Sequence, residues 1–232
     1  MKHLALFLYA AAGFAQSADL QYDAGSPTAA FAATEIRRAF AARGQSLVEN
    51  GSGAQAVRLI LTATVDKANA AADSLGVARL KTAGPQAYGI RRVQKARVTT
   101  VAVLATDGAG AMYGGLDLAE AVRLGTLGGL ADGDHSPYIE KRGIKFNVPL
   151  DARTPSYSDN SDAAQNNIAE MWSVEFWHEF IDEMARHRYN VLSLWSLHPF
   201  PSIVKVPEYP DVALNDVMRT KVPMDDTFSA TG

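Results

Sequence analysis

Apolar and polar residues alternate in the stretch RGIKFN, which places Ile144 and Phe146 on one face of a strand and Lys145 and Asn147 on the other. Val148 continues the apolar face, and the chain then breaks into a loop that contains two prolines. A strand with one apolar and one polar face needs neighbours on both sides. We therefore expect this strand to belong to a larger layered structure.

The stretch SVEFWHEFIDEMARHRY predicts a helix, because Trp177, Phe180, Ile181 and Met184 recur at steps of three and four residues. Ser173 can cap the start of this helix. The apolar run NVLSLWSLH that follows is typical of a buried strand. The order strand, long loop, helix and strand predicts two parallel strands that are joined by a right-handed crossover.

The part of the chain before residue 142 has a different pattern. Apolar spacing and glycines indicate a short strand at 20–23, a helix at 28–43, a strand at 57–65, a hairpin at 88–105 and a helix from 108 to about 125. These elements predict an α+β layer of strands covered by two helices. Residues 124–137 are rich in Gly and Asp and lack periodicity, so we expect the domain boundary there.

Composition describes an ordinary globular chain. The 232 residues are 47% hydrophobic and 20% charged, and the formal net charge is −3, which indicates one or two domains and no basic surplus that would attract nucleic acid. The sequence has no cysteine, which excludes disulfides and thiolate metal sites. We predict no metal, no cofactor and no nucleic-acid partner; the oligomeric state is left open.

The first residues, MKHLALFLYAAAGFAQ, have a weakly positive start, an apolar run from Leu4 to Ala12, and small residues at Gly13 and Ala15. This order is typical of a secretory signal peptide over residues 1–15, the alternative being a buried N-terminal helix. No other segment approaches the roughly 20 apolar residues of a membrane span. We therefore expect a periplasmic or secreted protein.

Two short motifs have both a chemical and a purely structural interpretation. The stretch TDGAGAMYGG follows a strand and opens a helix like a dinucleotide-binding loop, but its glycine spacing differs, which favours tight packing of helix on strand. The start of a zinc motif at His178 lacks its second histidine, because Asp182 stands there. We therefore expect His178 on a solvated helix face.

Several segments resemble a known group of glycosidases. The stretches QAYGI, VAVLATDGAGAMYGGLDLAEAV and RGIKFN resemble the second domain and the first barrel strand of bacterial beta-N-acetylhexosaminidases and alpha-glucuronidases. The run from RGIKFN to LHPFPS is similar to bacterial proteins that are usually classed with them. The resemblance implies a hexosaminidase-like α+β domain at 18–134 and, at 141–232, the first two strands of an incomplete (β/α)8 barrel.

The resemblance also implies roles for individual residues. Arg142 occupies the position of a hexosaminidase arginine that holds sugar hydroxyls. Asn147, Leu150, Ser193 and Trp195 replace an aspartate, an arginine and two histidines of that family. These differences favour an alpha-glucuronidase-like or an unassigned glycosidase over a hexosaminidase.

Barrel enzymes gather functional groups at strand ends and in the loops that follow them. The predicted substrate-binding residues are Arg142, Asn147, Asp151, Arg153, Trp195 and His198.

A full barrel takes about 250 residues, and only 91 follow Lys141 in this sequence. We therefore expect the catalytic carboxylates beyond these residues and leave the catalytic residues unassigned. The leading hypothesis is the N-terminal portion of an exported glycoside hydrolase that acts on a polysaccharide or oligosaccharide. The alternative is a carbohydrate-binding or structural module that does no chemistry.

Overall fold

The computed structural model describes residues 17–51, 55–82, 84–147, 173–195 and 206–212. The chain divides into two compact units, Met1–Glu140 and Lys141–Gly232. The predicted signal peptide, residues 1–15, lies outside the described residues.

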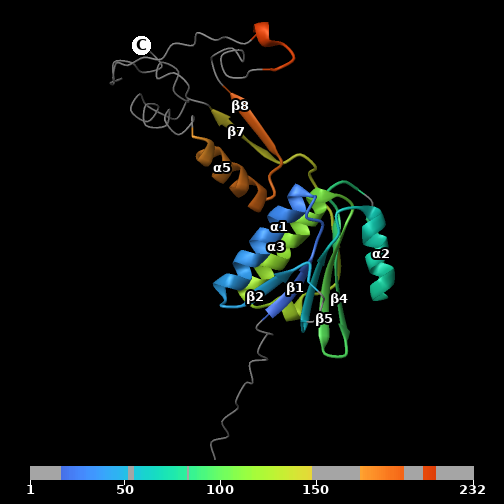
Figure 1. Ribbon diagram of the computed structural model, residues 1–232. Coiled ribbons are helices and arrows are strands. Elements are labelled where there is room, and N and C mark those ends of the chain that lie inside the picture. Colours follow the sequence, from blue (N-terminus) through green and yellow to red (C-terminus); the bar gives the residue numbers. More distant parts are fainter. Residues whose placement is uncertain (1–16, 52–54, 83, 148–172, 196–205, 213–232) are drawn as a thin grey trace, which may run out of the picture. The chain divides into compact units, whose positions relative to one another are not determined.

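The first unit is built on a six-stranded sheet with the order β2-β1-β3-β5-β4-β6 (Figure 1). Its strands are β1 (Ser17–Gln21), β2 (Ser46–Glu49), β3 (Val57–Leu61), β4 (Tyr88–Lys95), β5 (Val98–Ala105) and β6 (Gly133–His135). β2, β1, β3 and β5 run parallel to one another, and β4 runs antiparallel to both β5 and β6. The expected hairpin is present, since Lys95 of β4 pairs with Val98 of β5.

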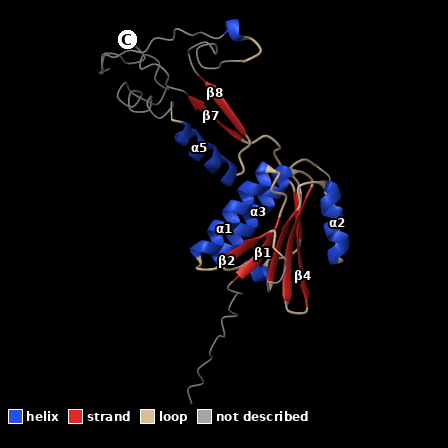
Figure 2. Ribbon diagram, viewed as in Figure 1, coloured by secondary structure: helices blue, strands red, loops and turns tan. Residues whose placement is uncertain are grey.

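Helices cover both faces of this sheet (Figure 2). α1 (Pro27–Ala42) and α3 (Gly108–Leu124) pack on one face, where Ile36 and Leu118 are fully buried with Leu20 and Leu59 of the sheet. α2 (Val65–Leu75) packs on the other face, with Ala68 and Ala72 against Ala102 and Leu104 of β5. A short 3-10 helix, Leu127–Gly129, follows α3. The chain is thus a mixed α/β protein with a mostly parallel sheet.

Three elements of the first unit, β2, α2 and β6, were not predicted from the sequence. α2 is a third helix that the apolar pattern did not indicate; Thr64 caps its start, and Gly76, at φ 70°, ends it in the left-handed conformation that glycine adopts without strain. β6 lies within the stretch 124–137 that we expected to be aperiodic. It pairs with β4 from His135, opposite Tyr88, to Gly133, opposite Ile90.

The described part of the second unit contains two parallel strands and the helix between them along the chain, as predicted. β7 (Gly143–Asn147) pairs with β8 (Val191–Trp195), and α5 (Val174–Arg186) precedes β8. A 3-10 helix, Pro210–Val212, lies further along the chain. A side chain at Gly143 would lie 2.2 Å from the carbonyl oxygen of Val191, so only glycine allows the two strands to approach this closely.

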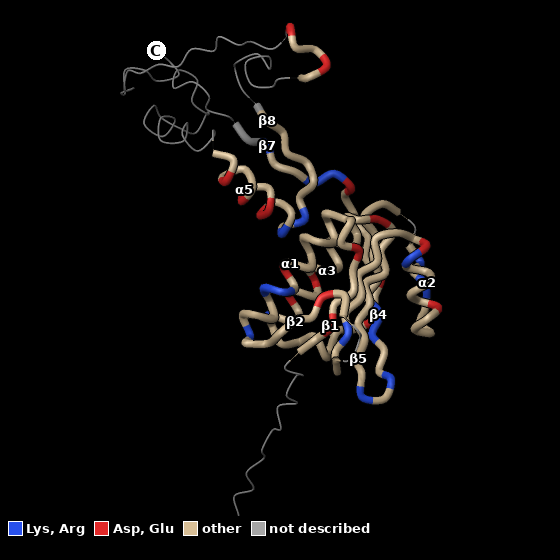
Figure 3. Tube along the Cα trace, in the orientation of Figure 1, with Lys and Arg blue, Asp and Glu red and all other residues tan. Residues whose placement is uncertain are grey.

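α5 begins at the capping residue that the sequence predicted. The Ser173 hydroxyl accepts a hydrogen bond from the backbone N–H of Phe176 at 3.2 Å, and Glu175 lies in the first turn. Figure 3 shows acidic residues along α5 and basic residues at its end. Glu175 in the first turn and Arg186 in the last turn complement the helix dipole. Phe176, Trp177 and Phe180 contact one another through their rings, and His178 is exposed as expected.

Candidate functional site

The strand ends of the second unit hold two of the six predicted substrate-binding residues. Asn147 and Trp195 are partners in the register of β7 and β8, at the carboxyl ends of the two parallel strands. Their backbones are therefore side by side at one edge of this small sheet. Asp151, Arg153 and His198 lie outside the described residues.

Arg142 occupies the other end of β7. It precedes Gly143, five residues before Asn147, and a strand rises about 3.3 Å per residue, so the two backbones are about 16 Å apart. The Arg142 guanidinium donates from Nε to the carbonyl oxygen of Arg188 at 2.9 Å, and its backbone N–H donates to Oδ1 of Asn190 at 2.8 Å. Arg142 thus fastens the turn between α5 and β8 to the start of β7 and does not lie beside Asn147.

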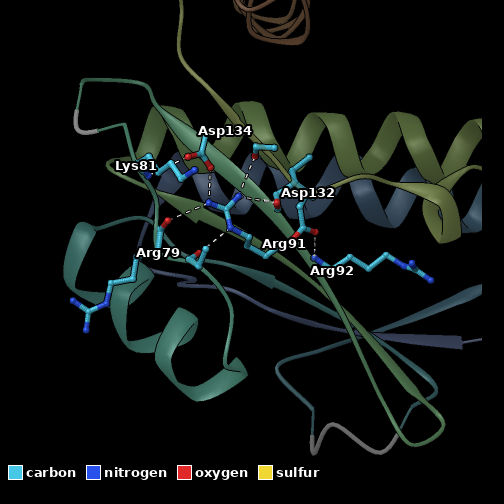
Figure 4. Close-up of polar contacts among 9 residues, drawn as sticks. Arg79, Lys81, Arg91, Arg92, Asp132 and Asp134 are labelled. Carbon is cyan, nitrogen blue, oxygen red and sulfur yellow. Dashed lines mark hydrogen bonds and ion pairs between the residues drawn. The ribbon is translucent and has the colours of Figure 1, made fainter.

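A polar cluster around Arg91 joins three segments of the first unit (Figure 4). Arg91 lies on β4, is 4% exposed, and donates from Nη2 to Oδ1 of Asp134 on β6 at 2.5 Å. Its remaining donors reach backbone carbonyl oxygens of Ala78, Arg79, Ile90 and Gly133. A guanidinium has five N–H groups, and all five are used. Arg91 is therefore a structural clamp with no side-chain donor left for a ligand.

Asp134 is held on both oxygens of its carboxylate. Oδ2 accepts the backbone N–H of Lys81 at 3.0 Å, while Oδ1 accepts from Arg91. Burial by itself would raise the pKa of Asp134, but the hydrogen bonds from Arg91 and Lys81 and the charge of both residues outweigh it and leave the pKa below its ordinary value. The carboxylate therefore stays ionised at neutral pH and keeps β6 on the sheet.

The glycine-rich start of α3 is a packing device. A side chain at Gly110 would lie 2.3 Å from the carbonyl oxygen of Ala87, and one at Gly114 would lie 2.4 Å from Cγ1 of Val103. The carboxylate of Asp107 accepts the N–H groups of Gly110 and Gln86, both at 2.7 Å. The first turn of α3, where a dinucleotide-binding loop would hold a phosphate, is thus closed by protein atoms.

An open cavity of about 430 Å³ lies at the carboxyl ends of β1 and β3. Its lining residues are Gln21, Tyr22, Asp23, Ala24, Asn50, Ile60, Leu61, Thr62 and Lys67. The sequence did not point to this cavity, because its wall comes from four separate segments and no two lining side chains form a recognised motif. A weak signal was present, since polar residues follow the apolar core of both strands.

Within the described residues, no group of three or more His, Asp or Glu side chains is arranged to hold a metal ion. No helix in those same ranges is long and apolar enough to cross a membrane.

No protein-family model matches the sequence, and no curated protein is similar to it. Among solved structures, the chain is similar to a GH138 enzyme targeting pectin rhamnogalacturonan II, with a TM-score of 0.52 and 21% sequence identity. The match covers 84% of this chain and 20% of that enzyme, so the chain spans about a fifth of its length. Since the first unit ends at Glu140 of 232 residues, a match over 84% extends into the second unit. The chain therefore shares its fold with part of that glycoside hydrolase.

Proposed function

We propose that the protein is an exported glycoside hydrolase that cleaves a polysaccharide or oligosaccharide. The observation that carries the proposal is the similarity of fold to the GH138 enzyme, which extends over both units of this chain. That enzyme targets a pectin, so a carbohydrate is the favoured class of substrate for this protein. The narrower assignment to an alpha-glucuronidase-like enzyme rests on the sequence resemblance alone.

In this proposal the two units have different tasks. Residues 18–134 form a hexosaminidase-like domain that does no chemistry, and residues 141–232 begin a (β/α)8 barrel. The parallel pair β7 and β8, with α5 between them in sequence, is the unit from which such a barrel is built. Asn147 and Trp195 end their strands at the rim where barrel enzymes bind substrate. An indole ring at that rim would stack on a sugar face, and an amide would bind hydroxyls.

The acid and the nucleophile are assigned to barrel strands other than β7 and β8. Glycoside hydrolysis needs a pair of carboxyl groups, about 5 to 10 Å apart, on either side of the scissile bond. The described ends of β7 and β8 carry an amide at Asn147 and an indole at Trp195, neither of which can donate a proton to a leaving group or attack a sugar carbon. These residues would therefore bind the substrate while the later strands cleave it.

A direct assay tests the proposal. The protein encoded by the whole reading frame and a chain of residues 1–232 alone would be incubated with rhamnogalacturonan II, xylan and aryl glucuronides. We expect sugar release by the former and none by the latter. Binding of a polysaccharide without release by either protein would favour the non-catalytic module instead.

A further inference from the structure

The cavity of the first unit lies where the chain leaves two neighbouring parallel strands toward opposite faces of the sheet. β1 pairs with β3, with Leu20 opposite Leu59. From β1 the chain passes into α1 on one face, and from β3 into α2 on the other face (Figure 2). Such a point leaves a crevice at the carboxyl ends of the strands, and ligands of open α/β sheets bind there. Gln21 and Thr62, at those two ends, line the cavity.

Two side-chain amides of the wall are oriented by the protein. Oε1 of Gln21 accepts a hydrogen bond from Nη2 of Arg58 at 2.7 Å, and Oδ1 of Asn50 accepts one from the backbone N–H of Tyr22 at 3.1 Å. Because a guanidinium and a backbone N–H only donate, each amide must present its oxygen to the protein. The NH₂ groups of Gln21 and Asn50 donate to no acceptor in the part of the chain that the structure describes.

The charges of the cavity cancel. Nζ of Lys67 lies 2.6 Å from Oδ2 of Asp23, and Oδ1 of Asp23 accepts the backbone N–H of Gly25 at 3.0 Å. The hydrogen bonds from Lys67 and from Gly25 lower the pKa of Asp23, so the carboxylate is charged at neutral pH. Each carboxylate oxygen keeps a lone pair that can accept a ligand hydroxyl. The Lys67 ammonium is already paired with a carboxylate, so the cavity does not select for an anion.

The start of α2 also disfavours an anionic ligand. Thr64 Oγ1 accepts the N–H of Lys67 at 3.3 Å, and Asp66 adds a negative charge to the first turn. A phosphate at this helix end would meet both a capped N–H and a carboxylate. The rest of the wall is apolar at Ile60 and Leu61 and aromatic at Tyr22, whose hydroxyl donates to Glu49 at 2.9 Å.

We propose that this crevice binds a neutral saccharide of one or two sugar units. Sugar hydroxyls both donate and accept, and the wall offers two amide donors, a carboxylate acceptor and an apolar and aromatic surface for the sugar face. The volume of about 430 Å³ falls within the range of about 300 to 1,000 Å³ of small-molecule sites. Every lining residue belongs to the first unit, so this site is additional to the rim of β7 and β8 and goes beyond the proposed function.

The binding experiment uses the full 232-residue chain and two-dimensional NMR of its backbone amides. Galactose, rhamnose and xylobiose are the neutral probes, and galacturonate and inorganic phosphate are the anionic ones. We expect at least one neutral probe to bind saturably and to shift the signals of Tyr22, Asn50 and Thr62. No saturable shift with any neutral probe, or stronger binding of galacturonate or phosphate at these residues, would overturn the proposal.

A double variant tests the two amide donors while keeping the hydrogen bonds that their oxygens accept within the protein. Gln21→Glu with Asn50→Asp keeps the oxygens that Arg58 and Tyr22 need, removes the two NH₂ groups and adds two negative charges. Each lost hydrogen bond is worth about 1 kcal/mol, so Kd should rise about tenfold or more. Asn69→Asp makes one such amide-to-carboxylate change on α2, outside the lining, and should leave Kd unchanged. An unchanged Kd in the double variant would contradict the site.

A neutral variant controls for the added charge. Ala24→Trp places a large ring in the cavity without altering its net charge and should abolish the shifts. Persistence of saccharide binding in this variant would also contradict the proposal. Because these experiments measure binding without turnover, a failed hydrolase assay leaves their outcome untouched, and the two proposals can fail separately.

Discussion

Arg91 on β4 and Asp134 on β6 form an ion pair in which Nη2 and Oδ1 are 2.5 Å apart, and only 5% and 17% of the two side chains are exposed. The pair attaches the three-residue edge strand β6 to the sheet. It also ties the segment after α2, through the carbonyl oxygens of Ala78 and Arg79, to the same point. Asp132 extends the attachment, since its Oδ1 accepts the backbone N–H of Arg92 at 2.8 Å (Figure 4).

Asp134→Ala should lower the free energy of unfolding of the first unit by about 3–5 kcal/mol, because it leaves the buried Arg91 without its counter-charge. Chemical denaturation followed by far-UV circular dichroism measures this change; tryptophan fluorescence would not, since all three tryptophans lie after residue 140. Asp73→Ala is the matched control. It breaks an ion pair with Arg79 in which both side chains are more than half exposed, and it should cost less than about 1 kcal/mol. Equal losses in the two variants would refute the clamp.

The ion pair of Arg91 and Asp134 also predicts that the stability of the first unit depends on pH. The folded-state pKa of Asp134 is depressed, so its stabilisation is fully present above the unfolded pKa of about 3.9 and is lost as pH falls through the folded value. The stability difference between the wild type and Asp134→Asn should therefore be constant from pH 7 to about pH 5 and shrink below about pH 4. Urea titrations at several pH values measure it. A difference that stays the same down to about pH 3 would argue against an ionised Asp134.

Gly114→Ala should destabilise the first unit by about 1–3 kcal/mol, although alanine is the better helix former by about 1 kcal/mol. The added methyl would lie 2.4 Å from Cγ1 of Val103 and 2.8 Å from the ring of Tyr88, and both side chains are buried. Gly129→Ala, where no heavy atom lies within 4 Å, is the control and should be neutral. Thermal melts of the two variants decide whether the glycine-rich motif serves packing, and unchanged stability in Gly114→Ala would speak against it.

The sequence predicted those helices and strands that have a clear apolar period within their own segment. α5 was predicted because large apolar residues repeat along it and Ser173 precedes it. α2 was missed because its buried face consists of Ala68 and Ala72, which leave no strong apolar period. β6 is only three residues long, and what holds it is a side-chain contact between residues 43 positions apart. No pattern along the chain reports such a contact.

The candidate sites also differ in whether neighbouring residues in the sequence or contacts in the fold define them. The order of strands and helix around residues 142–195 placed Asn147 and Trp195 at matching strand ends, and their register agrees. Arg142 was assigned by resemblance, although it comes first in the predicted strand and therefore lies at the end of β7 away from Asn147. The crevice depends on β1 lying beside β3, a neighbour relation that the sequence does not state.

The proposed export predicts a defined N-terminus for the mature protein. Cleavage between Ala15 and Gln16 should remove the signal peptide, because Gly13 and Ala15 occupy the positions that the processing enzyme reads. Intact-mass spectrometry of protein recovered from the periplasm or medium checks this. Recovery of the chain with Met1 still attached would contradict the assignment.

We propose that the carboxyl ends of β7 and β8 bind the carbohydrate substrate of the proposed hydrolase. The most direct test is kcat/KM of the protein encoded by the whole reading frame on the best polysaccharide found, with Asn147→Ala and Trp195→Ala compared with Val191→Ala at the other end of β8. We predict that kcat/KM falls at least about tenfold in the first two variants, as for the loss of about 1.4 kcal/mol or more of binding, and stays unchanged in the third. Full activity of both rim variants, or equal losses in all three, would contradict substrate binding at the carboxyl ends of β7 and β8.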